Sequence, residues 1–189
     1  GIGENSPDTI LHIKNTSGDK RGIIIENTVA SSYAEIHFKG AKEYRIGTGG
    51  SSTSPANRFY IYDTGANAHR FDIDTNGNVG IGTTAPGDYN AVGNKLVVAD
   101  SGNSGITIAS GTTGYGALYF ADGTSGSAEY MGAVEYNHSS NVMKIWANAD
   151  TDQLILDDSG NVGIGVTPTH TLHTLSTENK AFLLDRNTG

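Results

Sequence analysis

One six-residue peptide, Gly-Asn-Val-Gly-Ile-Gly, occurs twice in this chain, at residues 77–82 and 160–165. The two copies begin 83 residues apart, and Gly1-Ile2-Gly3 repeats the end of the same peptide at the start of the chain. A peptide that recurs at a long, fixed distance indicates a repeat protein, whose units share one structure. We therefore expect tandem β repeats of about 83 residues. The expected units are residues 1–79, residues 80–162, and the start of a third, truncated unit at 163–189.

Further segments are repeated between the copies. Gly22-Ile23-Ile24-Ile25 is matched by Gly105-Ile106-Thr107-Ile108, and Leu172-His173-Thr174 of the third copy matches Leu11-His12-Ile13 of the first. The chain begins and ends inside the repeat and has no initiator Met or signal peptide. We expect it to be a piece of a longer repeat protein.

The composition favours strands over helices. Clusters of Ser, Thr, Asn and Gly interrupt the chain so often that no segment keeps a helical period, which predicts an all-β fold. With no Cys in the chain, disulfides and thiolate metal sites are excluded. The net charge of −8, with no block of Lys and Arg, argues against nucleic acid as a partner. The apolar runs are far shorter than the roughly 20 residues of a membrane helix, so we expect no membrane insertion.

The alternation of apolar residues predicts the register of the hairpin that leads into each copy of the motif. A two-residue loop would pair Asp74 with Val79, whereas a three-residue loop, 75–77 in the first copy, puts the apolar residues of both strands on one face. This register pairs Ile73 with Val79 and puts Gly77 at a left-handed position, where glycine has no steric penalty. The same argument makes Gly160 the structural turn residue of the second copy.

Period-2 alternation predicts further half-buried strands, such as the one in which Ala34, Ile36 and Phe38 alternate with polar residues. Beside the motif, Gly80 and Gly163 leave one strand face bare, which indicates that another backbone or subunit approaches closely. The segments 47–56 and 132–140 share little sequence. We expect them to be surface loops, where binding residues can vary.

The motif followed by a short apolar strand, GNVGIGTTAP and then Lys95-Leu96-Val97-Val98, resembles the shaft repeats of bacteriophage tail fibres and receptor-binding fibres. The resemblance is best over residues 77–98 and 160–174. It implies an elongated homotrimeric fibre, in which such Gly-rich β repeats often precede a C-terminal intramolecular chaperone of the endosialidase type. A thin sheet with a modest apolar content also leaves faces and edges that other chains would cover.

Two metal sites can be imagined from spacing, and both are weak. Residues 72–77 match the opening of a calcium loop, D-x-D-x-N-G, but the twelfth position is Thr83 where Glu is needed, and no helices flank the loop. His170 and His173 are three residues apart, and copies of one histidine could gather on a trimer axis. We expect the first segment to be a turn and the histidines to be structural, so no metal site is predicted.

Catalytic motifs are absent from the sequence. Acidic pairs such as Glu26 with Glu35, or Glu129 with Glu135, suit sugar hydrolysis only if their carboxyl groups lie at the right separation, which spacing alone does not establish. Tyrosine and tryptophan faces suit sugar stacking, although Tyr62 and Trp146 share one repeat position and are better read as packing residues. Tyr136 lies in the divergent segment 132–140, which is expected to be a loop, and is therefore the candidate glycan contact.

Together these observations predict a non-enzymatic structural shaft segment of a viral tail or receptor-binding fibre, located in the virion. The shaft would hold a distal host-recognition tip away from the particle. The expected partners are two further copies of the chain and a host cell-surface glycan, and no cofactor is expected. Two alternatives stay open: a bacterial surface adhesin or fibre, and a polysaccharide-binding or polysaccharide-degrading tailspike segment.

Overall fold

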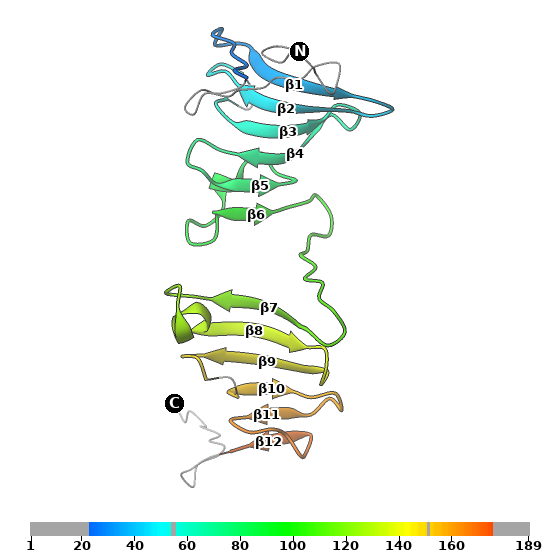
Figure 1. Cartoon of the computed structure of the whole chain (residues 1–189), viewed down its shortest axis with the longest axis vertical. Coiled ribbons are helices and arrows are strands. Elements are labelled where there is room, and N and C mark those ends of the chain that lie inside the picture. Colours follow the sequence, from blue (N-terminus) through cyan, green and yellow to red (C-terminus); the bar gives the residue numbers. More distant parts are fainter. Residues whose placement is uncertain (1–22, 54–55, 151, 176–189) are drawn as a thin grey trace, which may run out of the picture. The chain divides into compact units, whose positions relative to one another are not determined.

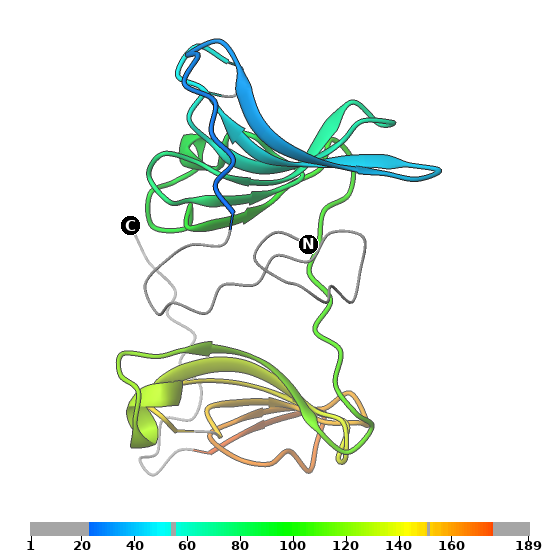
Figure 2. The same ribbon diagram turned by 45° about the horizontal axis from the view of Figure 1, so that its top comes forward.

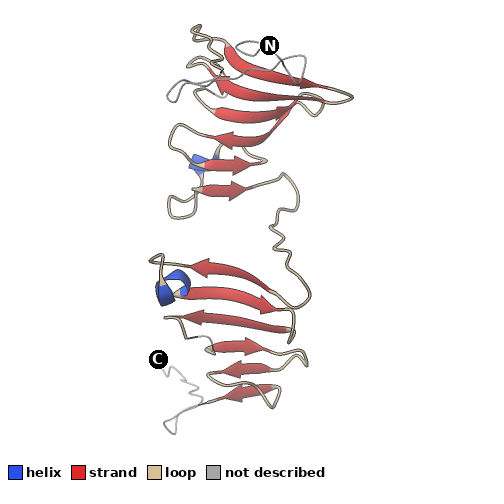
Figure 3. Cartoon of the chain, in the orientation of Figure 1, coloured by secondary structure: helices blue, strands red, loops and turns tan. Residues whose placement is uncertain are grey.

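The structure, a computed structural model, describes residues 23–53, 56–150 and 152–175. Over these residues the chain is all-β, as predicted, and forms two six-stranded sheets with two short 3-10 turns, η1 (Pro86–Asp88) and η2 (Gly126–Tyr130) (Figure 3). None of the described helical segments has the length and apolarity needed to cross a membrane. The chain divides into two compact units, residues 1–106 (unit 1) and 107–189 (unit 2).

The strands of unit 1 lie in the sheet in chain order (Figure 1). They are β1 (Tyr33–Lys39), β2 (Glu43–Gly49), β3 (Phe59–Asp63), β4 (Ala68–Ile73), β5 (Val79–Ile81) and β6 (Leu96–Val98). The first five pair antiparallel, whereas β6 runs parallel to β5. Parallel neighbours need a crossover connection, which the segment 82–95 with η1 provides.

Unit 2 has the same plan. Its strands, also in chain order, are β7 (Tyr115–Phe120), β8 (Gly132–Asn137), β9 (Val142–Ala147), β10 (Leu154–Leu156), β11 (Val162–Ile164) and β12 (Leu172–Thr174). Again only the last pair, β11 with β12, is parallel. Both copies of the Gly-Asn-Val-Gly-Ile-Gly motif therefore supply the fifth strand of a sheet.

The two folded units do not have the bounds of the repeats expected from the sequence, which start at the motif. The expected repeats, 1–79, 80–162 and 163–189, follow the period of the sequence, and these bounds remain a prediction. The segment 132–140, expected to be a surface loop, contains strand β8, and that prediction is wrong. The error arose because β7 and β8 are joined by a long connection containing η2, whereas β1 and β2 are joined by the short turn 40–42, so the two copies lose alignment there.

The hairpin register is the one expected from parity. Ile73 pairs with Val79 in the first copy, and Leu156 pairs with Val162 in the second. Gly77 and Gly160 have φ angles of 75° and 80°, in the left-handed region that favours glycine. In both loops the aspartate that directly follows the preceding strand, Asp74 or Asp157, accepts backbone hydrogen bonds from the loop.

Gly80 and Gly163 serve a different need from the turn glycines. A Cβ at Gly80 would lie 2.3 Å from the carbonyl oxygen of Thr83, and a Cβ at Gly163 would lie 2.0 Å from that of Val166. The backbone that approaches these bare strand positions is thus the chain's own crossover. Pro86 and Pro168, which follow in the two crossovers, are buried.

Each sheet forms a single layer (Figure 2). Its two faces carry different side chains. On the first face, which we call the apolar face, the registers bring together apolar residues from all six strands. In unit 1 these are Ile36, Phe38, Ile46, Phe59, Ile61, Phe71, Ile73, Val79, Ile81 and Leu96. None of them is buried, and Phe38 and Leu96 are 53% and 55% exposed.

The buried apolar residues lie on the opposite face, which we call the polar face. In unit 1 this face carries Tyr60, Asp72 and Val97, and in unit 2 it carries Trp146 and Ile155. The hairpin residues that share one face, among them Val79 and Ile81, therefore do not face a core within the single chain, because no second layer in the described residues covers their side. The apolar residues alternate as predicted, but the crossover packs on the other face.

Candidate functional site

The polar face of unit 1 contains a hollow of about 280 Å³, which we call the polar hollow. Four neighbouring strands line it with Tyr33, Glu35, Arg45, Tyr60, Tyr62 and His69. Alternate residues of a strand point to the same side, so the polar positions of β1, β2 and β3 project together above the sheet. Three tyrosines, a carboxylate and a guanidinium are thereby gathered in one place.

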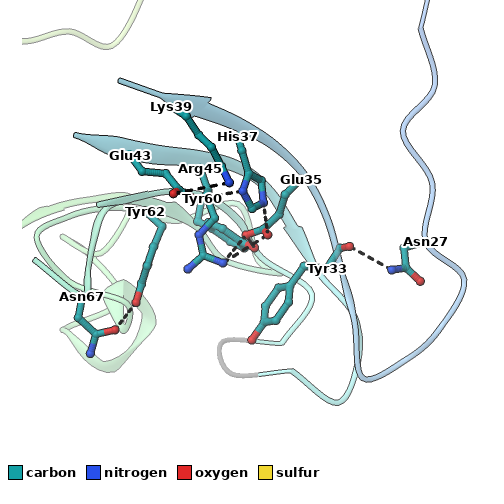
Figure 4. Close-up of polar contacts among 10 residues, drawn as sticks. All are labelled: Asn27, Tyr33, Glu35, His37, Lys39, Glu43, Arg45, Tyr60, Tyr62 and Asn67. Atoms are coloured by element: carbon teal, nitrogen blue, oxygen red, sulfur yellow. Dashed lines mark hydrogen bonds and ion pairs between the residues drawn. The ribbon is translucent and has the colours of Figure 1, made fainter. Parts of the chain in front are cut away.

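Glu35 is the centre of the hydrogen bonds in this hollow (Figure 4). The Tyr60 hydroxyl donates to Glu35 Oε1 over 2.6 Å, and Arg45 Nη1 donates to both carboxylate oxygens over 3.4 Å. His37 Nε2 lies 3.2 Å from Glu35 Oε2. Burial opposes ionisation of Glu35, but the bond from Tyr60 and the charge of Arg45 hold its pKa below the usual value. The carboxylate is therefore ionised and fully engaged at neutral pH.

Arg45 is held from two sides. Its guanidinium carbon lies 4.4 Å from the centre of the Tyr62 ring, a cation–π contact, while Nη1 binds Glu35. Its Nε is buried without a hydrogen-bond partner among the described residues. The Tyr62 hydroxyl donates to Asn67 Oδ1, which fixes the ring beneath the guanidinium.

Gly47 makes the contact between Tyr60 and Glu35 possible. These two residues lie on β3 and β1, and Gly47 lies between them on β2, where it pairs with both. A Cβ at Gly47 would lie 2.8 Å from Glu35 Cγ and 2.3 Å from the carbonyl oxygen of Ala34. Only glycine leaves room for the two side chains to meet across the middle strand.

We expect Gly47→Ala to destabilise unit 1 by about 2 kcal/mol, because either the β1–β2 pairing or the Glu35 side chain must shift. The measurement is urea unfolding followed by circular dichroism. Gly40→Ala is the matched control at the tip of the same hairpin, where a Cβ has its nearest neighbour at 3.7 Å. Equal unfolding midpoints for the two variants would contradict the role given to Gly47.

Beside the hollow lies a buried charged cluster. The Asp72 side chain is fully buried, its Oδ2 lies 3.1 Å from His69 Nδ1, and burial raises its pKa to about 7 despite the nearby charge of Arg58. Burial, together with Arg58 and Arg45, lowers the pKa of His69. The approach of Asp72 to His69 has ion-pair distance but poor hydrogen-bond geometry, so both groups stay without a hydrogen-bond partner in the described structure.

Unit 2 has a related hollow of about 410 Å³ on its polar face, but with other chemistry. It is lined by Tyr115, Tyr119, Tyr130, Glu135, Asn137, Lys144 and Trp146. In the two registers Ala133 occupies the place of Arg45, so unit 2 has no guanidinium there. Trp146 is buried, its ring centre lies 6.4 Å from that of Tyr119, and its Nε1 donates to Tyr130 O over 3.3 Å, which makes it a packing residue.

Tyr136, the candidate glycan contact, lies on strand β8 and not in a divergent loop. It pairs with Met143 on the apolar face, and its hydroxyl donates to Asn141 Oδ1 over 3.3 Å. The hollow around it, of about 320 Å³, is mostly apolar. The residues of the polar hollow, by contrast, were not predicted as a group, since their proximity depends on the register of four strands.

The aspartate in the middle of the calcium-like segment, Asp74, and its counterpart Asp157 hold their turns together. Asp74 Oδ1 accepts the amides of Asn76 and Asn78 over 2.8 and 2.9 Å, and Asp157 accepts those of Ser159 and Asn161 in the second copy. The segment 72–77 is thus an aspartate-capped turn.

The two histidines weighed as metal ligands are close together. Their ring centres are 5.9 Å apart, and Thr169 Oγ1 lies within hydrogen-bond distance of both, 3.0 Å from His170 Nδ1 and 3.3 Å from His173 Nδ1. His173 pairs with Gly163 and so lies on the polar face of its sheet. Over the described residues, no group of three or more His, Asp or Glu side chains has the arrangement of a metal site.

Comparison with known proteins assigns no family. No protein-family model matches the chain, and no curated protein sequence matches it significantly. The function has to be argued from the faces of the two sheets.

Proposed function

We propose that this chain is a structural segment of a homo-oligomeric fibre shaft, in which the apolar faces of several copies pack against one another. The observation that carries the proposal is the exposed apolar face, present in both units on equivalent strands. In unit 2 it contains Leu118, Phe120, Val134, Met143, Ile145, Leu154, Leu156, Val162, Ile164 and Leu172. None of these side chains is buried in the described structure.

A face of this kind is costly for a chain that stays alone. Burying apolar surface contributes roughly 25 cal/mol per Å², and monomeric proteins rarely leave large contiguous apolar patches in water. Ile81 and Ile164, the same position of the motif in the two units, are 43% and 48% exposed. A second copy presents the same apolar surface at the same repeat positions, so copies of the chain are the partner that fits along its whole length.

The number of copies and the biological setting follow from the resemblance of the motif to bacteriophage fibre repeats. We propose a homotrimer in the virion, with repeats of about 83 residues adding length to the shaft. Its task is mechanical and non-enzymatic: it positions a distal host-recognition tip. The polar faces then lie outward, where charged groups such as Lys39, Glu43 and Lys144 meet water.

The molar mass in solution tests this proposal. We expect three times the 19.7 kDa chain mass, unchanged on dilution, from light scattering coupled to gel filtration. The double variant Ile81→Lys/Ile164→Lys should give single chains, because it buries charges in the contact. Val92→Lys, at an apolar loop residue that is 97% exposed, is the matched control and should leave the mass unchanged. A well-folded, stable wild-type monomer would refute the proposal.

A further inference from the structure

We propose that the polar hollow of unit 1 is a binding site for a neutral sugar ring. The proposal goes beyond the shaft function and concerns a site within one unit of one chain. It starts from the lining of the hollow, which combines flat aromatic rings with polar groups. This is the combination by which proteins bind pyranose rings: an aromatic face packs on the C–H face of the sugar, and polar groups bond its hydroxyls.

The aromatic groups are already fixed in position. The ring centres of Tyr33 and Tyr60 are 6.2 Å apart, and the His69 ring lies 5.1 Å from each of Tyr60 and Tyr62, all in edge-to-face geometry. In Figure 4 the side chains of Tyr33, Arg45 and Tyr62 extend from the same side of the sheet. A ligand would therefore meet a site whose side chains need little ordering, which lowers the entropic cost of binding.

The polar hollow and its surroundings also contain polar groups that have no hydrogen-bond partner. The Tyr33 side chain is 39% exposed, and its hydroxyl makes no hydrogen bond within the described residues. Buried side-chain atoms without a hydrogen-bond partner, among the residues described, all belong to the hollow or to the cluster beside it: Arg45 Nε, Arg58 Nη1, His69 Nδ1 and both carboxylate oxygens of Asp72. Such unmet groups are rare in folded proteins, and here they are confined to the polar face around the hollow.

The balance of charge favours a neutral ligand. Within the hollow, the Glu35 carboxylate opposes an anion, and the Arg45 guanidinium opposes a cation. A neutral polyhydroxylated ring avoids both conflicts, and its hydroxyl groups can donate to or accept from the exposed Tyr33 hydroxyl. The hollow, about 280 Å³ in volume, is of the size of a one-ring or two-ring site.

The test is saturation-transfer NMR on the whole chain, with D-glucose, D-galactose and N-acetyl-D-glucosamine offered singly. We expect transfer to at least one of them, and Tyr33→Ala should raise its Kd about tenfold or more. Tyr33→Phe, which keeps the ring and removes only the hydroxyl, should raise it less. Tyr115→Ala, at the corresponding start of β7 in unit 2, is the matched control and should leave the Kd unchanged.

Three results would overturn the inference. One is the absence of saturation transfer to any of the three sugars, which would mean that the hollow binds only water. The second is equal binding by wild type and Tyr33→Ala. The third is tighter binding of glucuronate or glucosamine than of glucose, which would refute the neutral ligand. Because the hollow lies within unit 1, a negative result leaves the oligomeric shaft standing, and a monomeric wild type leaves the sugar site standing.

Discussion

Gly163→Ala is expected to lower the free energy of unfolding of unit 2 by about 3 kcal/mol. The added Cβ would lie 2.0 Å from Val166 O and 2.9 Å from Pro168 Cδ, and the first of these atoms is backbone. A flexible side chain could move aside, but a carbonyl oxygen in the crossover moves only with the chain that joins β11 to β12. The parallel strand pair at the end of the sheet is therefore the element at risk.

Trp146, the single tryptophan of the chain, lies in unit 2 and reports its unfolding by fluorescence in urea. Gly111→Ala is the control in the same unit, since a Cβ there has no neighbour within 4 Å and the backbone is not left-handed. It should unfold like the wild type. If Gly163→Ala did so too, the close approach of the crossover to β11 would be wrong.

Asp72→Asn is expected to stabilise the protein by about 2 kcal/mol at pH 8, where this free energy already includes a reduction for solvent screening. Near pH 4 the substitution should have little effect. Burial raises the pKa of Asp72 to about 7, above its usual value of 3.8. Between these values the unfolded chain has lost the proton while the folded one keeps it. The contribution of Asp72 to the free energy of unfolding is therefore most favourable at about pH 4 and declines as the pH rises to about 7.

The measurement is urea unfolding of both proteins by circular dichroism at about pH 4, 6 and 8. His69, whose pKa burial lowers, acts in the opposite direction below its usual value of 6.5, because acid charges it more readily in the unfolded chain. His69 is present in both proteins, so the effect of its burial is common to both, and the difference between them reports Asp72 together with its contact to His69. An advantage of the variant that is constant with pH, or that shrinks as the pH rises, would contradict the burial of an uncompensated carboxyl group.

Much of the local structure could be predicted from the sequence. The three-residue loop in each hairpin followed from parity, since a two-residue loop would pair Asp74 with Val79, whereas a three-residue loop pairs Ile73 with Val79. The alternation at Ala34, Ile36 and Phe38 predicted a strand, which is β1. The alignment of the two repeat copies failed over 132–140. The insertion around η2 displaces β8 there, and an alignment at a fixed offset does not allow for a change in loop length.

The polar hollow was beyond prediction for a different reason. Glu35, Arg45 and Tyr60 stand at alternate positions of their strands, which gives the face of each residue but not its neighbour on the next strand. Register and the gap at Gly47 decide that they meet. Arg58, His69 and Asp72 looked like ordinary polar residues of a charged chain, and only their burial distinguishes them.

The sequence by itself determined the all-β class, the repeated hairpin and its turn glycines, Gly77 and Gly160, because strand periodicity and left-handed turns depend on residues close in the chain. The tertiary structure decided which face of each sheet is covered. The alternation of apolar and polar residues assigns each residue to one of the two faces. It does not show on which face the crossover packs. The crossover lies over the polar face at Gly80 and Gly163 and leaves the apolar residues open in both units, and this exposure directs the proposed function toward assembly with further copies.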